Sequence, residues 1–292
     1  MDDPLRNRPR DLLIAGHVNV DEFLRVTDFP LADRTVPVVA RHSELGGTAT
    51  NLALTAARYG VVCGLVARLG TGFPAAFRER LEAGQVDLRG LETLPHRTTP
   101  TCYIVEDRRG GQRTLIDQGA MADGSPHRFR VGPWLSEYSW LHLTTGPPAA
   151  LLSLQRAARV AGLHVAADPG QETHYRWDSL HLRRLLRDSE VLWGNRSEID
   201  RAASLLELRG PEALLQLVPL IVRTEGAEGA TAFSRAGSVH VRATRPRKVR
   251  TSVGAGDSFR GGFYAAWFAG QRLKECLTAG ERAATRWLEG AR

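Results

Sequence analysis

Cysteine is scarce in this sequence, and its few copies form no recognisable pattern. Cys63, Cys102 and Cys276 lie far apart and make no CxxC pair. This argues against a disulfide framework and a thiolate zinc site, and each cysteine is expected to pack as a small buried hydrophobe. The histidines form no HExxH motif and no helical ligand pair, so no histidine metal site is predicted. A reducing, cytoplasmic setting is the expectation.

Long apolar runs are also absent. No stretch approaches the roughly 18 consecutive apolar residues of a membrane span, and the short apolar run near the N-terminus is better explained as a buried strand than as a signal peptide. Lysine is rare, so the net charge of +7 comes mainly from arginines scattered along the chain. The one basic cluster, at 245–250, has no interleaved aromatic residues. We therefore expect no membrane and no nucleic acid as partner, and an arginine-rich surface that helps to attract anionic substrates.

The sequence does contain a regular alternation of short apolar runs and helical stretches. Buried strands are predicted at 11–18, 61–70, 140–145, 163–168, 190–195 and 220–226. Helices are predicted at 48–59, 74–84, 148–161, 179–188, 198–208 and 211–217. This alternation is typical of an α/β fold with a doubly wound, mostly parallel sheet flanked by helices. We expect residues 1–292 to form a single domain.

Two segments interrupt the alternation and predict a small β-sheet lid. The segment at about 20–45 contains two runs typical of antiparallel strands, and the segment 98–118 has the pattern of a hairpin around RRGG. Phe23, Phe29 and Tyr103 are candidates for stacking on a substrate base, or for the core of the lid. Because exposed strand edges can pair with a second copy, we weigh a homodimer through the lid against a monomer with short edges.

The stretch GAGDSF at 254–259 carries the clearest chemical signal. Gly254, Ala255 and Gly256 present backbone N–H groups at a helix start, where unpaired donors and the helix dipole favour an anion. Asp257 beside them could accept a proton from a hydroxyl nucleophile, as phosphoryl transfer requires. The helix start is expected to keep this carboxylate ionised. The residues alone leave open a second interpretation, in which Asp257 only N-caps the helix.

Four further motifs lie at strand exits, the edge at which open α/β sheets bind ligands. They are Asn19 and Asp21 in GHVNVD, Gly46, Gly47 and Asn51 in GGTATN, Asn195 and Glu198 in GNRSE, and Thr224, Gly226 and Gly229 in RTEGAEG. Each is weak alone, because Asn195 and Glu198 could equally form a capping box. The carboxylate of Asp21 offers two acceptors to a vicinal diol.

In this order, the motifs resemble the ribokinase-like (PfkB) family of carbohydrate and nucleoside kinases, from about residue 11 to residue 285. The resemblance implies the doubly wound fold with a β lid, and phosphorylation of a hydroxymethyl group with ATP and Mg²⁺. It makes Asp257 the general base and the N–H groups of 254–256 the anion hole. It assigns Asn195, Thr224, Gly226 and Gly229 to ATP, Glu198 to Mg²⁺ through water, and Asn19, Asp21, Gly46, Gly47 and Asn51 to the acceptor hydroxyls.

Two positions depart from the family pattern. Thr251 stands where members often carry an acid of a monovalent-cation site, which leaves K⁺ dependence open, and the loop 70–74 lacks its usual acid. The motifs at 118–121 and 168–171, together with Arg260, are similar to those of adenosine and nucleoside kinases. A nucleoside is therefore the expected acceptor. A sugar of the ribose, fructose or inositol type, and a non-catalytic ligand-binding member of the family, are the alternatives.

Overall fold

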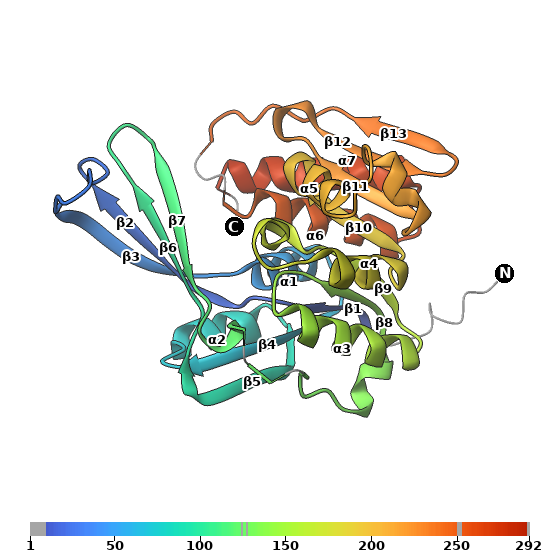
Figure 1. Ribbon diagram of the computed structural model, residues 1–292, viewed down its shortest axis with the longest axis horizontal. Helices are drawn as coiled ribbons and strands as arrows, with labels where there is room; N and C mark the ends of the chain where they lie inside the picture. The colour runs from blue at the N-terminus through green and yellow to red at the C-terminus, as the bar shows by residue number, and fades with distance from the viewer. Residues whose placement is uncertain (1–9, 124, 127, 250–252, 291–292) are drawn as a thin grey trace.

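The main body of the protein is built on one nine-stranded sheet, with the strand order β13-β12-β11-β10-β9-β8-β1-β4-β5 (Figure 1). The computed structural model describes residues 10–123, 125–126, 128–249 and 253–290. The strands of this sheet are β1 (Arg10–Ala15), β4 (Cys63–Thr71), β5 (Asp87–Thr98), β8 (Tyr138–Leu143), β9 (His164–Ala167), β10 (Val191–Asn195), β11 (Leu220–Thr224), β12 (Ala230–Ser234) and β13 (Gly237–Val241). Strands β11, β10, β9, β8, β1, β4 and β5 run parallel, and β12 and β13 are antiparallel additions at one edge.

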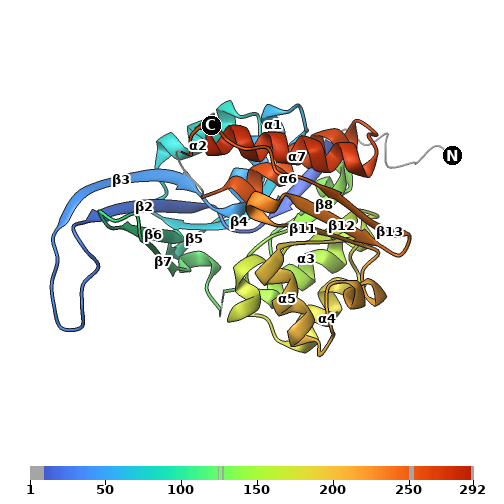
Figure 2. The ribbon, with the colours of Figure 1, turned by 90° about the horizontal axis from the view of Figure 1, so that it is seen from above.

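Helices cover both faces of this sheet, as Figure 2 shows. One face carries α1 (Thr48–Arg58), α2 (Ala75–Ala83), α6 (Ala255–Phe268) and α7 (Leu273–Leu288), and the other carries α3 (Pro148–Val160), α4 (Ser179–Arg187) and α5 (Arg196–Leu205). Each face has its own hydrophobic core. In β1, Leu13 and Ala15 enter one core while Leu12 and Ile14 enter the other. This explains the unbroken apolar run of the first strand, because a strand buried on both faces has no polar side.

A second, four-stranded sheet stands away from the main body and is called the lid sheet below (Figure 1). Its strand order is β3-β2-β6-β7, with β2 (Asn19–Val26), β3 (Val38–Gly46), β6 (Thr101–Glu106) and β7 (Gln112–Asp117). Strands β2 and β6 pair parallel, and the two outer pairs are antiparallel. The register places Asp21, Cys102 and Ile116 opposite one another, so they share one face, and Tyr103 lies on the other.

The predicted fold class is confirmed, although helix α7 was not among the predicted helices and three further details differ. Residues 211–217 do not form an α-helix; the structure has a 3-10 helix at Glu212–Gln216, after Pro211. Strand β5 was not predicted, because its sequence contains Gly90, Pro95 and several charges; its position at the sheet edge tolerates them. The hairpin of β12 and β13 was also not predicted. None of the described helices has the length and apolar character to cross a membrane.

Candidate active site

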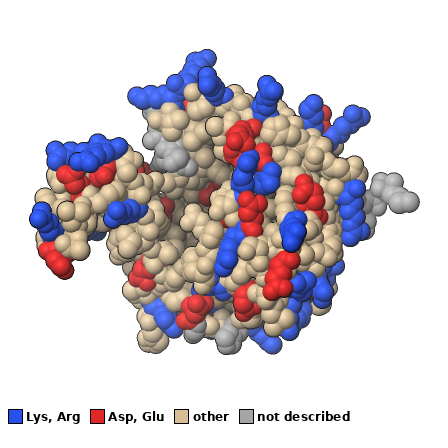
Figure 3. Space-filling view, turned by 45° about the horizontal axis from the view of Figure 1, so that its top comes forward, with Lys and Arg blue, Asp and Glu red and all other residues tan. Residues whose placement is uncertain are grey.

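A cavity of about 490 Å³ lies where the lid sheet meets the carboxyl ends of β10 and β11. Figure 3 shows the hollow between the lid sheet and the main body, with acidic side chains inside it. Most of the predicted site residues line this cavity: Asn19, Asp21, Gly47, Asn51, Asn195, Glu198, Thr224, Gly254, Gly256 and Asp257. They come from β2, α1, β10, α5, β11 and α6 and from the turns before these helices. The fold thus brings distant motifs to one place.

Four of the described candidates are not among the lining residues. Gly46 lies directly behind Asp21, where a Cβ would sit 1.9 Å from Asp21 Oδ2. Gly229 lies against β13, and a Cβ there would sit 2.0 Å from the carbonyl oxygen of Val241. Gly226 begins the short 3-10 turn after β11, and Ala255 is the first residue of α6. Gly46 and Gly229 thus serve the packing of neighbouring strands, whatever else they contact.

The turn that begins α6 places Asp257 at the cavity. Gly254 is the N-cap residue with φ of 84°, a left-handed conformation that favours glycine. Asp257 sits in the first turn, and the helix has no side-chain cap, so Asp257 does not act as the N-cap. Instead its Oδ2 accepts a hydrogen bond of 3.2 Å from Asn51 Nδ2 of α1. The capping interpretation of Asp257 is therefore not realised in the structure.

The electrostatic surroundings of Asp257 differ from the sequence expectation. Removal of water from around the charged form raises the pKa of Asp257 to about 6, against the opposing influence of Arg260 and of the Asn51 hydrogen bond. The negative charges of Asp168 and Glu198 also raise this pKa. The pKa of the carboxyl group therefore lies close to neutral pH instead of being lowered by the helix start, which suits a group that must accept a proton.

A chain of buried polar groups lies beneath Asp257. Arg260, one helical turn further along α6, donates from Nη2 to Asp168 Oδ1 at 2.8 Å, and its Nε lies 2.5 Å from Oδ2. His142 Nε2 is 3.2 Å from the same Oδ2, and His142 Nδ1 is 2.7 Å from the hydroxyl of Tyr264. Burial alone would raise the pKa of Asp168, but the charge of Arg260 and the bond from His142 lower it.

Most of this series of buried polar side chains was not identified from the sequence. Arg260 and Asp168 had only indicated a substrate class, and His142 and Tyr264 had not been singled out. One signal was present, because Asp257, Arg260 and Tyr264 are spaced i, i+3 and i+7 on one helix and so share a face. A carboxylate, a guanidinium and a phenol in that spacing indicate a polar face turned toward a partner.

The capping box predicted as an alternative at the end of β10 is present. Asn195 Oδ1 accepts from the Glu198 backbone N–H at 2.9 Å, and Glu198 Oε2 accepts from the Asn195 N–H at 2.7 Å. Both residues also line the cavity. Burial, and then the charge of Asp168, raise the pKa of Glu198. The capping role and a role toward a ligand are therefore compatible for this pair.

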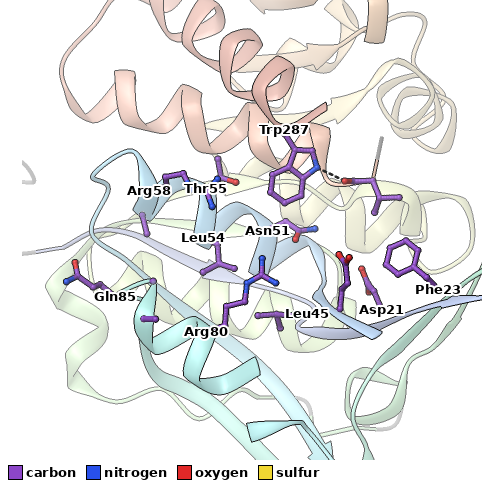
Figure 4. Close-up of a pocket in the computed structure, with 15 residues that line it drawn as sticks. Asp21, Phe23, Leu45, Asn51, Leu54, Thr55, Arg58, Arg80, Gln85 and Trp287 are labelled. Atoms are coloured by element: carbon purple, nitrogen blue, oxygen red, sulfur yellow. Dashed lines mark hydrogen bonds between the residues drawn. The ribbon is translucent and has the colours of Figure 1, made fainter. Parts of the chain in front are cut away.

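A second cavity of about 440 Å³ lies beside the first, and Asp21, Asn51 and Val253 line both (Figure 4). Trp287 of α7 borders it and donates from its indole nitrogen to the carbonyl oxygen of Val253 at 2.6 Å. A Cβ on Gly254 would lie 2.8 Å from the Trp287 ring. Trp287 thus supports the turn before α6 from behind, a contact the sequence did not indicate.

The aromatic residues proposed for stacking lie elsewhere than expected. Tyr103 is on the face of the lid sheet opposite the cavity-lining Cys102 and Ile104. Phe29 packs against the guanidinium of Arg113, with 4.2 Å from the carbon to the ring centroid. Phe23 borders the second cavity and stacks on His42 with ring centroids 4.8 Å apart. Tyr175, from the main body, lines the first cavity.

The remaining sequence expectations concern metals and cysteines. Within the described ranges, no group of three or more His, Cys, Asp or Glu side chains is arranged to hold a metal ion. Thr251, on which the K⁺ question rests, lies outside the described residues. Cys63 and Cys276 are buried as predicted, whereas Cys102 is half-buried and lines the cavity.

An acid beside a backbone turn suited to anions, sharing one cavity with side chains suited to hydroxyl groups, defines the class: a phosphotransferase that acts on a hydroxyl group. The family description "pfkB family carbohydrate kinase" matches residues 9–288. The chain belongs to this PfkB family.

Individual relatives agree with this family. The chain is 30% identical over 269 residues to a nucleoside kinase of Methanothermobacter thermautotrophicus, covering 91% of this chain and 85% of that protein. It is 29% identical to an ATP-dependent ribose-1-phosphate kinase of Halopiger xanaduensis, covering 96% and 93%. The crystal structure of a Methanocaldococcus jannaschii nucleoside kinase superimposes with a TM-score of 0.88 at 23% identity, covering 97% and 93%. At that identity, the last comparison concerns the fold alone.

Proposed function

We propose that this protein is an ATP-dependent kinase that phosphorylates the hydroxymethyl group of a nucleoside, with Asp257 as the general base. The observation that carries the proposal is the common cavity lined by Asp257, by Gly254 and Gly256 of its turn, and by Asp21. One end of this cavity suits a transferred phosphoryl group, and Asp21 with Asn19 suits the hydroxyls of the acceptor. The same residues in separate cavities could not perform the reaction.

The transfer step uses these groups as follows. The acceptor hydroxyl oxygen attacks the γ-phosphorus of ATP, and its proton passes to the Asp257 carboxylate. The new P–O bond forms as the bond to the bridging oxygen of ADP breaks, and ADP leaves with the electron pair. The backbone N–H groups of the 254–256 turn stabilise the negative charge of the transferred oxygens. Asn51 orients Asp257 through their 3.2 Å hydrogen bond.

ATP is assigned to Asn195, Thr224, Gly226 and Gly229, which lie at the ends of the neighbouring strands β10 and β11 and in the turn beyond. Mg²⁺ usually keeps several waters and binds through one or two carboxylates and the substrate phosphates. The cavity-lining carboxylate of Glu198, in the first turn of the helix after β10, fits such a site. Mg²⁺ would be held there by the ATP phosphates and, through water, by Glu198, and would neutralise phosphate charge.

The preference for a nucleoside rests on the acceptor end of the cavity. There the lid sheet contributes the apolar side chains of Ile104 and Ile116, and the main body contributes the ring of Tyr175. A planar base can pack on such surfaces, whereas a free sugar has little apolar area to bury. The name of the Methanothermobacter relative supports the same acceptor. A sugar kinase of the same family is the alternative, supported by the name of the Halopiger relative.

The test is ADP release from Mg·ATP with a panel of nucleosides, ribose, fructose, inositol and their phosphates. The expected result is turnover with a nucleoside that is lost by roughly 10²–10⁴-fold in Asp257→Asn, because the base is removed at constant shape. Asp200→Asn, which changes an exposed carboxylate on α5, is the matched control and should keep full activity. Faster turnover of a sugar would favour the carbohydrate alternative. Binding of an acceptor without any turnover would favour the alternative of a non-catalytic, ligand-binding member of the family.

A further inference from the structure

Arg260 is the only lysine or arginine among the described residues that line the proposed active-site cavity. It is only 6% exposed. A guanidinium is seldom buried without a partner, and here the partner is Asp168. The charged groups near Arg260 are Asp168, Asp257 and Glu198. All three are acids, and each of them raises the pKa of Arg260. This cavity therefore has one positive side chain in surroundings that are otherwise negative.

The guanidinium is held in one orientation. Its Nη2 and Nε both face the two oxygens of Asp168, at 2.8 and 2.5 Å. Asp168 is itself fixed by His142, whose other ring nitrogen contacts Tyr264. The guanidinium carbon also lies 5.8 Å from the ring centroid of Trp193. These contacts fix the direction of the guanidinium before any ligand binds, and Asp168 is itself one of the residues that line the cavity.

The third nitrogen, Nη1, makes none of these contacts with Asp168. A Cβ on Gly256 would lie 3.0 Å from Arg260 Nη1, so this nitrogen sits against the turn that carries the proposed anion hole. Within the described part of the chain, every hydrogen bond and ion pair of Arg260 involves Nε or Nη2. Two N–H donors of Nη1 therefore remain beside the backbone N–H groups of the turn, in a cavity-lining residue.

We propose that Arg260 is a catalytic residue whose Nη1 donates to the transferred phosphoryl group, alongside the backbone donors of the 254–256 turn. This inference rests on the proposed kinase function. A donor already fixed by Asp168 needs no reorganisation when charge develops on the phosphoryl oxygens, which is the condition under which such donors are most effective. Asp168 is the positioning residue, because its Oδ1 accepts a hydrogen bond from Nη2 and its Oδ2 forms an ion pair with Nε.

The alternative is a purely structural Arg260, present only to neutralise buried Asp168. The two roles predict different kcat values or ligand affinities for the variants Arg260→Met, Arg260→Lys and Asp168→Asn. As a catalytic donor, Arg260→Met should lower kcat by roughly 10²–10³-fold, the range for loss of one preorganised donor. Arg260→Lys, which keeps the charge but loses the planar fork, should fall between the wild type and Arg260→Met. KM for the acceptor should change little in either, because the phosphoryl group is not part of the acceptor.

A pH profile separates direct action from action through Asp257. Loss of Arg260 also removes a charge that favours ionised Asp257, which moves the acid limb of activity to higher pH. If this were the whole effect, kcat of Arg260→Met would recover to the wild-type plateau at alkaline pH. A catalytic donor instead requires that kcat stay low across the plateau. Full alkaline recovery would overturn the proposal.

Binding gives a second measurement that does not depend on turnover. Calorimetry compares the affinity for Mg·ADP alone with that for Mg·ADP plus fluoroaluminate, a mimic of the transferred phosphoryl group. Arg260→Met should lose the extra affinity gained with fluoroaluminate by at least about tenfold while binding Mg·ADP normally. Asp168→Asn should lose part of it. Equal loss of both affinities, or no loss of either, would show a structural role.

Folding and the underlying function are controlled separately. If Arg260→Met does not unfold cooperatively, Arg260→Lys and Arg260→Gly with added guanidinium take its place, and restored kcat in the latter supports the donor role. Failure of guanidinium to restore any activity to a folded Arg260→Gly would count against it. If the wild type turns over no acceptor, the proposed kinase function fails. If the wild type is active and folded Arg260 variants keep its plateau kcat, only the role of Arg260 fails.

Discussion

Replacing Asn51 by alanine removes the one side-chain hydrogen bond that Asp257 makes among the described residues. That bond stabilises the ionised carboxylate, so its loss should raise the pKa of Asp257 above the native value of about 6. Hydrogen bonds to charged groups contribute about 1.5–3 kcal/mol. Because the 3.2 Å bond is long, we take the lower limit, which corresponds to a rise of about one pKa unit.

If Asp257 is the general base, as proposed, it works when deprotonated, so activity rises with pH and the acid limb should move to higher pH. With a midpoint shifted by about one unit, the ionised fraction at pH 6 falls from about half to about a tenth, a loss of about fivefold, and almost nothing is lost above pH 8. The assay is the pH dependence of kcat/KM, which reports the free enzyme. Its midpoint is independent of any separate loss of acceptor binding.

Asn19→Ala is the matched control. Asn19 is also a buried cavity asparagine on the acceptor side. Among the described residues, the side-chain hydrogen bond to Asp257 comes from Asn51 and not from Asn19. Asn19→Ala should raise KM without moving the midpoint. If the pH profile of kcat/KM has the same midpoint in Asn51→Ala, Asn19→Ala and the wild type, the link between Asn51 and the pKa of Asp257 is refuted.

Four further outcomes are expected. Asp21→Ala should raise the acceptor KM by roughly tenfold or more, because it removes two hydroxyl acceptors, and an unchanged KM would contradict its assignment. Gly254→Ala should lower the unfolding free energy by about 1–3 kcal/mol and reduce kcat, because its Cβ adds a clash with Trp287 to the positive-φ strain. Gly60 is the control, because it has a similar φ of 87° and open space around it. Gly60→Ala should therefore cost only the backbone strain and leave kcat unchanged. ATP hydrolysis without acceptor should be slow if the lid sheet excludes water on closing, and rapid ATPase activity would argue against that closure. Light scattering should show a homodimer if the lid edges pair, and a monomeric mass would remove that proposal.

The parts of the fold that the sequence predicted are those with a strong local pattern. The first strand was recognisable because all its central residues are apolar, and the structure buries Leu12, Leu13 and Ile14 between the two cores. Strand β5 has no such pattern, since only one neighbouring strand and the sheet edge constrain it. Tertiary position, not local preference, makes it a strand.

The candidate site divides in the same way. Asp257 and its turn could be proposed from the sequence because the proposed phosphoryl transfer needs bare backbone and an acid within a few consecutive residues. The contact between Arg260 and Asp168 joins positions 92 residues apart, and the contact between Asn51 and Asp257 joins positions 206 apart. Neither of these two contacts can be predicted from the sequence unless it is known which strand ends are neighbours. Likewise, alternation places Tyr103 and Ile104 on opposite faces of the lid sheet, but only the packed molecule shows which face turns to the cavity.

Because the indole of Trp287 supports the turn before α6, the order in which the ribosome synthesises the chain affects when activity can appear. Trp287 emerges from the ribosome after Asp257, yet it holds the carbonyl of Val253 and packs against Gly254. Until Trp287 docks, the nascent chain can have a nearly complete sheet and still lack the support for the turn before α6, which is the proposed catalytic turn. The enzyme should therefore become competent late, when α7 is in place. A bulky fusion joined directly after α7 should disturb catalysis more than one joined before β1.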